Sequence, residues 1–420
     1  MKAAVLRLTL LHRLWRLFPA RQRRRLAARA AFLLHYRIGK SAPPARRGVA
    51  IAGELSRASG LGEGARVMLR ALDYLAMPNW AVDIGDLLPG ASHEIAVSLC
   101  QPPPAGTPLV LHVNPPMLPL VLLRLPRALI RERRLIGYWA WELPVAPTEW
   151  RAAARLMHEI WVPSQFTATA IEPLLPGRVR VVPHPLAVAP PMCSAMGRAD
   201  FGFPADAVVV LVSMSLASSL ERKNPFGAIA AFRAAFGDRP DRLLVLKIGY
   251  PEHFPTDFER ITAAVAGAPN IRIDTRTLSQ HDRHALTAAS DIVLSLHRSE
   301  GFGLVPAEAM LLGKPVIATG WSGNMQFMDA TSAALVGYRL VASRDPREVY
   351  RDSRWAEPDQ EEAVAELRRL ADDPSERVAL GERGRHRALV RLGAAPLEEA
   401  LRSIGLFDHG VELEMVPIRR

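Results

Sequence analysis

The sequence predicts an α/β protein with two parallel-sheet domains. At 420 residues it exceeds one average domain, and two domains of about 150 to 200 residues are the natural expectation. Hydrophobic residues make up 49% of the chain, enough for a substantial core. From residue 48 onward, short continuous apolar runs alternate with helical stretches. Such runs are typical of strands in a parallel sheet that helices cover on both faces.

A basic arm, residues 1–47, precedes the first of these runs. The whole chain holds 53 basic and 42 acidic residues, and residues 1–53 hold thirteen Lys or Arg and no Asp or Glu. The remainder therefore carries 40 basic and 42 acidic residues, so the net charge of +11 belongs to the arm. This distribution weakens an interpretation as a nucleic-acid-binding protein, and we expect no nucleic-acid partner.

The arm has two open interpretations. Residues 6–34 mix leucine, Trp15 and Phe18 with arginine, a basic and partly amphipathic pattern that suits an anionic membrane surface. A solvated helix packed on the first domain, or a disordered tail, fits the same residues. No apolar run reaches the length of a membrane span or forms the core of a secretory signal. We therefore expect a cytoplasmic protein that could be peripheral on the inner face of the plasma membrane, with residues 1–40 as the contact.

The first domain is expected at residues 48–190. A buried strand at 48–52 leads into a glycine loop and a helix. Apolar residues of that helix recur at helical spacing at Leu61, Ala65, Met68, Leu69, Leu72 and Leu75. Further strands are expected at 109–113, 135–140, 160–162 and 179–182.

The second domain is expected at residues 198–390, after a linker within 186–198 that contains Pro190, Pro191 and Gly197. Its strands are expected at 207–213, 243–246, 271–273, 292–296 and 316–318. Residues 360–392 look helical and charged, and the tail at 391–420 could pack back on the first domain by analogy with similar folds. Cys100 and Cys193 are far apart and show no metal or redox spacing, which suits a reducing compartment.

The most informative segment is residues 299–320, SEGFGLVPAEAMLLGKPVIATG. Pro306 suits the first turn of a helix, where its missing N–H would have no partner. The amides of Gly303 and Leu304 would then point out of that helix N-terminus, which favours an anion such as phosphate. Glu300 precedes the glycine loop and Glu308 lies in the helix, so carboxylates for sugar and ribose hydroxyls stand beside amides for a diphosphate. A strand, turn and amphipathic helix in an ordinary α/β domain is the alternative.

This segment resembles the family 4 retaining glycosyltransferases, whose hallmark is two glutamates separated by seven residues around a G-F-G-L type loop. The resemblance continues through 314–319 and 322–324, and upstream through 221–225 and 139–144. It covers roughly residues 48–360. It implies a GT-B architecture, in which two Rossmann-like domains face each other across a cleft, with the acceptor on the first domain and a nucleotide-sugar donor on the second.

The resemblance also implies roles for the residues of this motif. Glu308 should accept hydrogen bonds from the ribose hydroxyls, and Glu300 should contact the sugar near the reacting centre. Glu300 would position the sugar and offset developing charge, with no covalent step. The donor should also contact the loop residues Gly301, Phe302, Gly303 and Leu304.

Positive side chains and amides would have to stabilise the leaving diphosphate, because the expected catalytic loops contain no Asp-x-Asp triplet for a metal. We expect no metal or other cofactor. Arg222 and Lys223 follow the first strand of the second domain, and Lys223 matches the phosphate-binding lysine of the family. Ala217 stands where a common family pattern has an arginine, so the role of Arg222 is less secure. A solvated basic turn is the alternative for the pair.

Other candidates come from loops that should face the cleft. Gly60 and Gly62 open a helix after the first strand and would let backbone approach the donor closely, although a tight turn with no ligand explains them too. His112 ends the strand 109–111 and could reach the sugar or simply be packed there. Leu278 falls where the family contacts the nucleotide base through its backbone, or in an ordinary loop.

Acceptor residues are expected after the strand at 135–140. Alternation places Trp139 and Trp141 on one face, and aromatic faces suit sugar stacking, although core packing explains both tryptophans equally well. Glu142 could bind acceptor hydroxyls or act as a base.

The sequence thus predicts a metal-independent, retaining hexosyltransferase that uses a nucleoside-diphosphate sugar, with GDP-mannose or UDP-glucose favoured. Its acceptor would be a saccharide. The basic arm favours a lipid-linked saccharide of bacterial exopolysaccharide or lipopolysaccharide synthesis. The alternative is a membrane- or nucleic-acid-binding protein whose glycosyltransferase-like body is inactive. A dinucleotide-dependent oxidoreductase is disfavoured, because Ala65 breaks the G-x-G-x-x-G fingerprint at its sixth position.

Overall fold

The computed structural model describes residues 38–39, 41–88, 95, 102–350 and 352–407. The membrane-surface prediction for residues 1–40 therefore falls almost wholly outside the described residues, as do Cys100 and the last part of the predicted tail. No described helix is both long and apolar enough to cross a membrane.

The first domain is built on a six-stranded parallel sheet in the order β2-β1-β3-β4-β5-β6. Its strands are β1 (Val49–Gly53), β2 (Asn79–Asp83), β3 (Leu109–Leu111), β4 (Leu135–Tyr138), β5 (Glu159–Val162) and β6 (Val179–Val181). All five predicted strands are present. The prediction missed β2, an edge strand whose five residues are only half-buried and do not form an apolar run.

The second domain repeats this plan in the order β12-β11-β10-β7-β8-β9, again all parallel. Its strands are β7 (Val208–Ser215), β8 (Arg242–Gly249), β9 (Ile271–Asp274), β10 (Ile292–Ser295), β11 (Val316–Thr319) and β12 (Ala334–Val336). Five of these were predicted. An antiparallel hairpin of β13 (Tyr338–Ala342) and β14 (Arg354–Pro358) follows, which the sequence patterns did not indicate.

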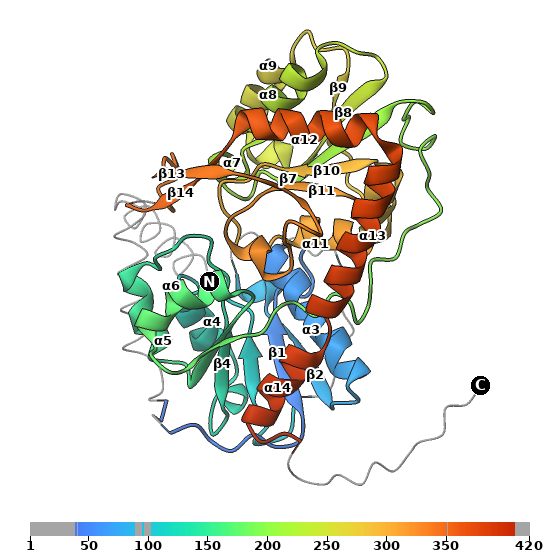
Figure 1. The fold of residues 1–420 in the computed structure, drawn as a ribbon. Helices are drawn as coiled ribbons and strands as arrows, with labels where there is room; N and C mark the ends of the chain where they lie inside the picture. Colours follow the sequence, from blue (N-terminus) through green and yellow to red (C-terminus); the bar gives the residue numbers. More distant parts are fainter. Residues whose placement is uncertain (1–37, 40, 89–94, 96–101, 351, 408–420) are drawn as a thin grey trace, which may run out of the picture.

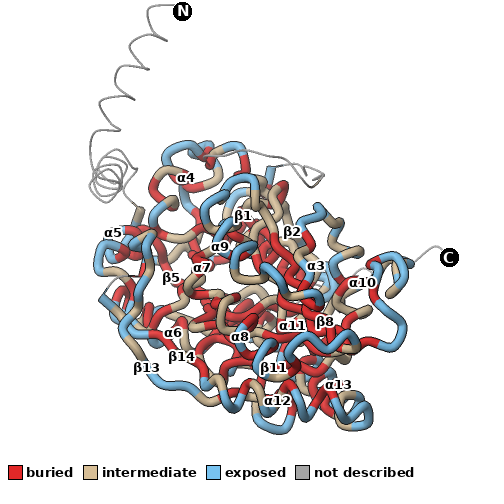
Figure 2. The backbone as a smooth tube through the Cα atoms, turned by 90° about the horizontal axis from the view of Figure 1, so that it is seen from above, coloured by how far each residue is buried: buried red, intermediate tan, exposed pale blue. Residues whose placement is uncertain are grey.

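Helices cover both faces of each sheet (Figure 1). In the first domain they are α3 (Gly60–Tyr74), α4 (Leu118–Arg124), α5 (Arg151–Ala154) and α6 (Gln165–Ile171). In the second domain they are α7 (Leu220–Lys223), α8 (Pro225–Phe236), α9 (Pro255–Val265), α10 (Gln280–Ala289), α11 (Leu304–Leu311) and α12 (Gln360–Asp372). Buried residues concentrate in the middle of the molecule and exposed ones lie on its outer loops and helices (Figure 2).

Alternate residues of each central strand enter different cores, as expected for a sheet buried on both sides. Ala50 and Ala52 of β1 pack in one cluster, whereas Val49 and Ile51 pack with α3 in another. The second sheet is divided in the same way between two further clusters. The carboxyl ends of the strands, where the loops carry polar residues, are thereby left to form a site.

The end of the chain returns to the first domain. The predicted helical stretch breaks at Asp373, whose carboxylate caps α13 (Pro374–Arg391) by accepting the amide of Glu376 at 2.9 Å. Helix α13 leads to α14 (Ala395–Ser403), which lies beside β1 and β2 (Figure 1). Leu397, Ala400, Leu401 and Ile404 are buried in the same cluster as residues of β1 and α3. The chain thus ties its two domains together twice, once through the linker and once through these helices.

Candidate active site

The loops at the carboxyl ends of the two sheets meet at the domain interface. The hydroxyl of Ser164, the N-cap of α6, donates to the carbonyl of Gly301 at 2.7 Å, and the hydroxyl of Ser299 donates to the carbonyl of Glu142. The backbone of Gly301 also lies against the backbone of Trp141, so close that a Cβ on Gly301 would be 3.0 Å from the Trp141 carbonyl oxygen. The predicted donor loop of the second domain therefore packs directly on the predicted acceptor loop of the first.

The turn into α11 has the geometry that the sequence predicts. Gly303 adopts a φ of +97°, a left-handed conformation that favours glycine, and is the N-cap of α11. Pro306 falls in the first turn of that helix. The first N–H groups of a helix have no partners within it, so the amides that follow Gly303 are available to an anion.

The segment after β11, at Ser322 and Gly323, packs against the loop that begins at Glu300 and holds it by hydrogen bonds. The amide of Gly323 donates to the carbonyl of Glu300 at 2.8 Å, and the hydroxyl of Ser322 accepts the amide of Glu300 at 2.8 Å. A Cβ on Gly323 would collide with the backbone of Gly301 and Phe302. Phe302 itself is buried between His184 and Phe327, so its side chain supports the loop, and its contact with the donor stays a prediction.

Two short capping motifs place Arg222 and Lys223 opposite this turn. The hydroxyl of Ser219 caps α7 by accepting the amide of Arg222 at 3.3 Å. Asn224 is left-handed at φ 53° and caps α8, which begins at Pro225 as predicted. The resulting tight turn between β7 and α8 aims both basic side chains at Glu300.

Glu300 is buried between these two cations. Arg222 Nη1 lies 2.9 Å from Glu300 Oε2, and Lys223 Nζ lies 2.5 Å from Glu300 Oε1. Burial alone would raise the pKa of Glu300, but Lys223 and Arg222 outweigh it and hold that pKa well below its usual range. Glu300 is therefore ionised throughout the neutral range, which suits a group that stabilises positive charge.

Arg222 is the buried hub of a wider network. Its guanidinium also donates to the carbonyl of Ser299 and to the hydroxyl of Ser218, each at 2.6 Å, and lies 3.9 Å from Glu142 Oε1. Burial would lower the pKa of Arg222, but Tyr350, Glu300 and Glu142 raise it above its ordinary value. Sequence patterns gave Arg222 a less secure role than Lys223, yet it makes more contacts in the cluster.

Tyr350 joins the network from the connection between β13 and β14. It is buried, its hydroxyl donates to Glu142 Oε2 at 3.1 Å, and the Arg222 guanidinium lies 5.8 Å from its ring centroid. Burial, with Glu142 close by, raises the pKa of Tyr350 well above its ordinary value, so the phenol stays a hydrogen-bond donor. The second domain therefore holds the side chain of Glu142, a residue of the first domain, in place.

We expect Tyr350→Phe to lower the free energy of unfolding by about 1 to 2 kcal/mol, because the Glu142 carboxylate loses a hydrogen bond across the domain interface. Urea denaturation of the purified chain measures the change. Tyr338→Phe, at an exposed tyrosine of the same hairpin, is the matched control. Equal stability of the two variants would mean that the bond between Tyr350 and Glu142 contributes nothing measurable.

Trp141 lies in the core of the first domain. It is only 5% exposed, its indole N–H donates to the carbonyl of Val145 at 2.9 Å, and its ring packs edge-on against Trp150. Trp139 contacts the same Trp150, which confirms that the two tryptophans share a face. The packing interpretation therefore accounts for Trp141 in this structure, and its stacking on an acceptor stays a prediction.

The two predicted loop glycines have different surroundings. Gly60 faces the second domain, since a Cβ there would lie 3.9 Å from a methyl group of Leu304. Gly62 is crowded by the carbonyls of Glu54 and Arg57 within its own loop. Gly60 thus stands next to the predicted phosphate-binding turn, whereas Gly62 is required by the local turn.

His112 is fully buried at the end of β3, as the packing alternative expects, and its contact with the sugar stays a prediction. Its ring stacks on Tyr138 at 4.3 Å, and neither ring nitrogen has a hydrogen-bond partner. Burial lowers the pKa of His112 well below its ordinary value, with His184 adding to the effect. His297, which precedes Glu300 by three residues, is equally buried and also has two unpartnered ring nitrogens. Sequence patterns gave no signal for His297.

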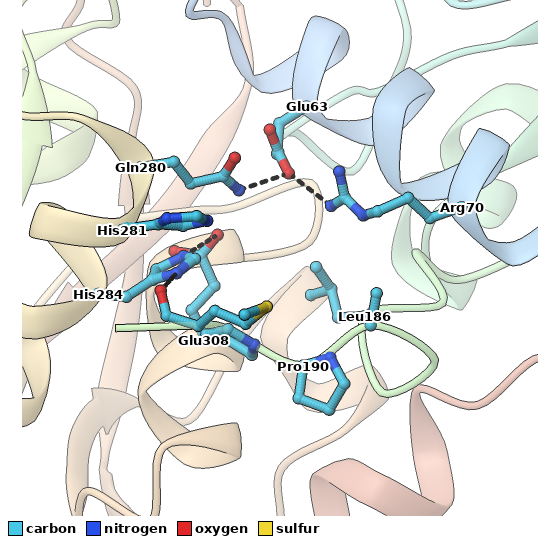
Figure 3. A pocket seen from close by; sticks show the side chains of 11 residues that line it. Glu63, Arg70, Leu186, Pro190, Gln280, His281, His284 and Glu308 are labelled. Atoms are coloured by element: carbon cyan, nitrogen blue, oxygen red, sulfur yellow. Dashed lines mark hydrogen bonds and ion pairs between the residues drawn. The ribbon is translucent and has the colours of Figure 1, made fainter. Parts of the chain in front are cut away.

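Glu308 lies apart from the Glu300 cluster and lines a pocket between the domains (Figure 3). Its Oε1 is 3.9 Å from Nε2 of His284 on α10. The predicted base-contacting residue Leu278 is half-buried and packs against the core on this side of the second sheet. Within the described ranges, no three His, Cys, Asp or Glu side chains are grouped to hold a metal ion.

A family model described as "Family 4 Glycosyltransferase in conflict systems" matches residues 183–386, a range that includes Arg222, Lys223, Glu300 and Glu308. The chain carries a family 4 glycosyltransferase domain. This domain coincides with the second parallel sheet and the linker before it.

A curated relative supports the same family. The chain is 30% identical over 226 residues to a D-inositol 3-phosphate glycosyltransferase of Kineococcus radiotolerans, a match that covers 51% of this chain and 48% of that protein. The chain therefore spans about half the length of this relative, and less of the next ones.

Solved structures confirm the GT-B fold of the whole described body. Sucrose-phosphate synthase from Thermosynechococcus elongatus superposes with a TM-score of 0.61 at 17% identity, covering 86% of this chain and 99% of that one. HepE from Anabaena, solved in complex with UDP and glucose, gives a TM-score of 0.57 at 15% identity, covering 85% and 99%. The predicted pair of Rossmann-like domains is thus confirmed, and the family 4 domain is its second half.

Proposed function

We propose that this chain is a retaining glycosyltransferase that moves a hexose, glucose or mannose, from a nucleoside-diphosphate sugar to a saccharide acceptor without a metal ion. The observation that carries the proposal is the buried Glu300 carboxylate, held between Arg222 and Lys223 beside the N-terminus of α11. In one small volume this arrangement supplies cations and amides for a diphosphate and a carboxylate for a sugar.

The leaving diphosphate would bind at Lys223 and the first amides of α11. Lys223 is partly exposed, with 23% of its side chain accessible, so its ammonium can turn from Glu300 toward a phosphate. Arg222 stays buried and fixes Glu300 in place. Electrostatic stabilisation by preorganised cations and amides would supply the part that a metal ion plays elsewhere.

The transfer step would form a bond from an acceptor oxygen to the anomeric carbon as the bond from that carbon to the diphosphate oxygen breaks. The bonding electrons leave with the diphosphate, and the acceptor proton passes to a phosphate oxygen on the same face, so the configuration is retained. Glu300 would stabilise the positive charge that develops on the sugar. It forms no bond in this step.

The acceptor would approach from the side of the first domain. The Glu142 carboxylate keeps 23% of its side-chain surface accessible while Tyr350 fixes its orientation, so it can accept a hydrogen bond from an acceptor hydroxyl. A lipid-linked saccharide of bacterial exopolysaccharide or lipopolysaccharide synthesis fits a chain whose basic arm, residues 1–40, would rest on the cytoplasmic membrane surface.

A panel of UDP- and GDP-sugars, offered to the purified chain in the presence of EDTA, tests the proposal. We expect one donor to bind and to be slowly hydrolysed, and Glu308→Ala to weaken its binding by about 10- to 100-fold through loss of hydrogen bonds to a charged group. Calorimetry measures the binding, and release of the nucleoside diphosphate measures the hydrolysis.

Glu366→Ala, which removes a carboxylate paired with Arg369 on the surface of α12, should bind the donor as the wild type does. If the folded wild-type chain binds no member of the panel, the proposal fails. An inactive body with a membrane-binding arm would then explain the chain better. If donor binding or hydrolysis requires a divalent ion, only the proposal that the transfer needs no metal is contradicted.

A further inference from the structure

The pocket that contains Glu308 lies where α3 of the first domain, α10 and α11 of the second, and linker residues 186–192 come together (Figure 3). Its polar side chains include Glu63, Arg70, Gln280, His284 and Glu308. The pocket begins one turn into α11, beyond the amides proposed for the diphosphate. It is therefore placed to receive the part of a donor that follows the diphosphate.

Three of these polar side chains, Glu63, Arg70 and Gln280, are already paired with one another. Glu63 Oε1 accepts from Arg70 at 3.0 Å and from Gln280 at 2.9 Å, and Glu63 Oε2 accepts from Arg66 at 2.8 Å. Arg66 and Arg70 thereby hold the pKa of Glu63 below its ordinary value, although burial alone would raise it. This carboxylate ties the two domains together and has little capacity left for a ligand.

His284 is different. It is 95% buried, since only 5% of its surface is exposed, and its Nδ1 lies 3.0 Å from the carbonyl oxygen of Met192 in the linker. A carbonyl oxygen can only accept, so Nδ1 carries the proton of the neutral ring. The other nitrogen, Nε2, is then an acceptor, and the linker fixes the direction in which it points.

The group opposite Nε2 is a second acceptor. Glu308 Oε1 lies 3.9 Å from it, which is too long for a hydrogen bond. The Glu308 carboxylate takes no hydrogen bond from any described side chain, so its oxygens and Nε2 together present only acceptors to the pocket. The diphosphate of a nucleotide sugar, whose oxygens can only accept, would be repelled by this pair. A ligand with two neighbouring hydroxyl donors would satisfy both groups.

We propose that His284 completes the ribose site expected at Glu308, so that each of the two side chains accepts one hydrogen bond from the cis-diol. The proposal rests on the proposed function and deepens it, because it makes His284 a specificity residue that selects ribonucleotides over deoxyribonucleotides. Burial and the bond to Met192 give His284 one orientation, so the selection needs no rearrangement of the ring.

Two substitutions of His284 test the roles of its two ring nitrogens separately. The amide N–H of His284→Asn can replace Nδ1 in donating to Met192 but leaves nothing at Nε2. His284→Gln places an amide oxygen near the position of Nε2. His253→Asn, at an exposed histidine that does not line the pocket, controls for the loss of an imidazole.

The test is calorimetric binding of UDP and GDP, and of their 2′-deoxy and 3′-deoxy forms, to the wild type and these variants. Whichever of UDP and GDP the wild type binds more tightly, we expect its affinity to exceed that of each of its deoxy forms by about tenfold. This ratio is the equivalent of one hydrogen bond. His284→Asn should lose the preference at one hydroxyl and keep it at the other. His284→Gln and His253→Asn should keep both.

If His284→Asn retains both preferences, the inference is wrong even though the nucleotide binds. If the wild type binds neither UDP nor GDP, the proposed function itself fails, and this inference fails with it. A wild type that binds ribo and deoxy forms equally overturns the inference and leaves the proposed function standing.

Discussion

Replacing Glu300 with glutamine is expected to lower the turnover of the nucleotide sugar by about 10²- to 10³-fold, the usual effect of removing one preorganised electrostatic group. Binding of the free nucleoside diphosphate should stay equal or become tighter. Turnover should thus fall without a loss of binding, a combination that a variant that merely unfolds would not show.

The reason lies in the contacts of the two cations. Lys223 lies 2.5 Å and Arg222 lies 2.9 Å from the Glu300 carboxylate, so in the free chain this carboxylate occupies the cations that a diphosphate would use. A neutral amide competes less strongly for Lys223 and leaves more of its charge to the phosphate. The same amide cannot stabilise positive charge at the anomeric carbon, so the chemical step slows.

Turnover under saturating donor and calorimetric binding of UDP or GDP measure the two quantities. Glu366→Gln, a carboxylate paired with Arg369 on α12, should change neither. Turnover of Glu300→Gln within a few-fold of the wild type would exclude Glu300 from the chemistry. Weaker binding of the diphosphate would show that Glu300 organises Lys223 and does not compete with the phosphate.

The sequence was sufficient for most of the fold because its parallel strands are continuous apolar runs. The runs at 135–140 and 243–246, for example, lie in strands that are buried almost throughout. Strands β2 and β13 escaped prediction because they are half-buried or exposed. Edge elements of this kind have no apolar pattern for a sequence analysis to detect.

The candidate site was predictable only where its residues share one local motif. Glu300 and Glu308 stand on either side of a single turn, and Lys223 follows a strand directly. Tyr350 is 208 positions from Glu142, and only the packing of the domains brings them together. His284 gives no signal in the sequence, because its acceptor nitrogen is fixed by a carbonyl of the linker.

Three buried histidines are expected to make the stability of the folded chain strongly dependent on pH. The free energy of unfolding is expected to fall steeply as the pH drops below 6.5, the ordinary pKa of histidine. Burial lowers the pKa of His184 to about 4 in spite of nearby Glu63, and it lowers that of His297 to about 4 in spite of nearby Glu300. His112 shifts in the same direction.

The sign follows from where the protons bind. Between pH 6.5 and about 4 the unfolded chain binds protons on these rings and the folded chain does not, so the stability present above pH 6.5 is lost as the pH falls through this window. Each ring contributes about 1.4 kcal/mol per pH unit. Near pH 5, His184 and His297 together would cost about 4 kcal/mol, a large share of the stability of an ordinary domain.

Urea unfolding between about pH 8 and about pH 5 measures this loss. His297→Asn should start from a lower stability near neutral pH and then lose about 1.4 kcal/mol less per pH unit than the wild type. Because that variant could fail to fold, nuclear magnetic resonance of the histidine ring protons provides an independent measurement. The rings of His112, His184 and His297 should remain neutral down to about pH 5 in the folded wild type. Titration of all three near their ordinary pKa would mean that water reaches the domain interface beside Glu300, and the low-dielectric setting on which the proposed chemistry depends would be lost.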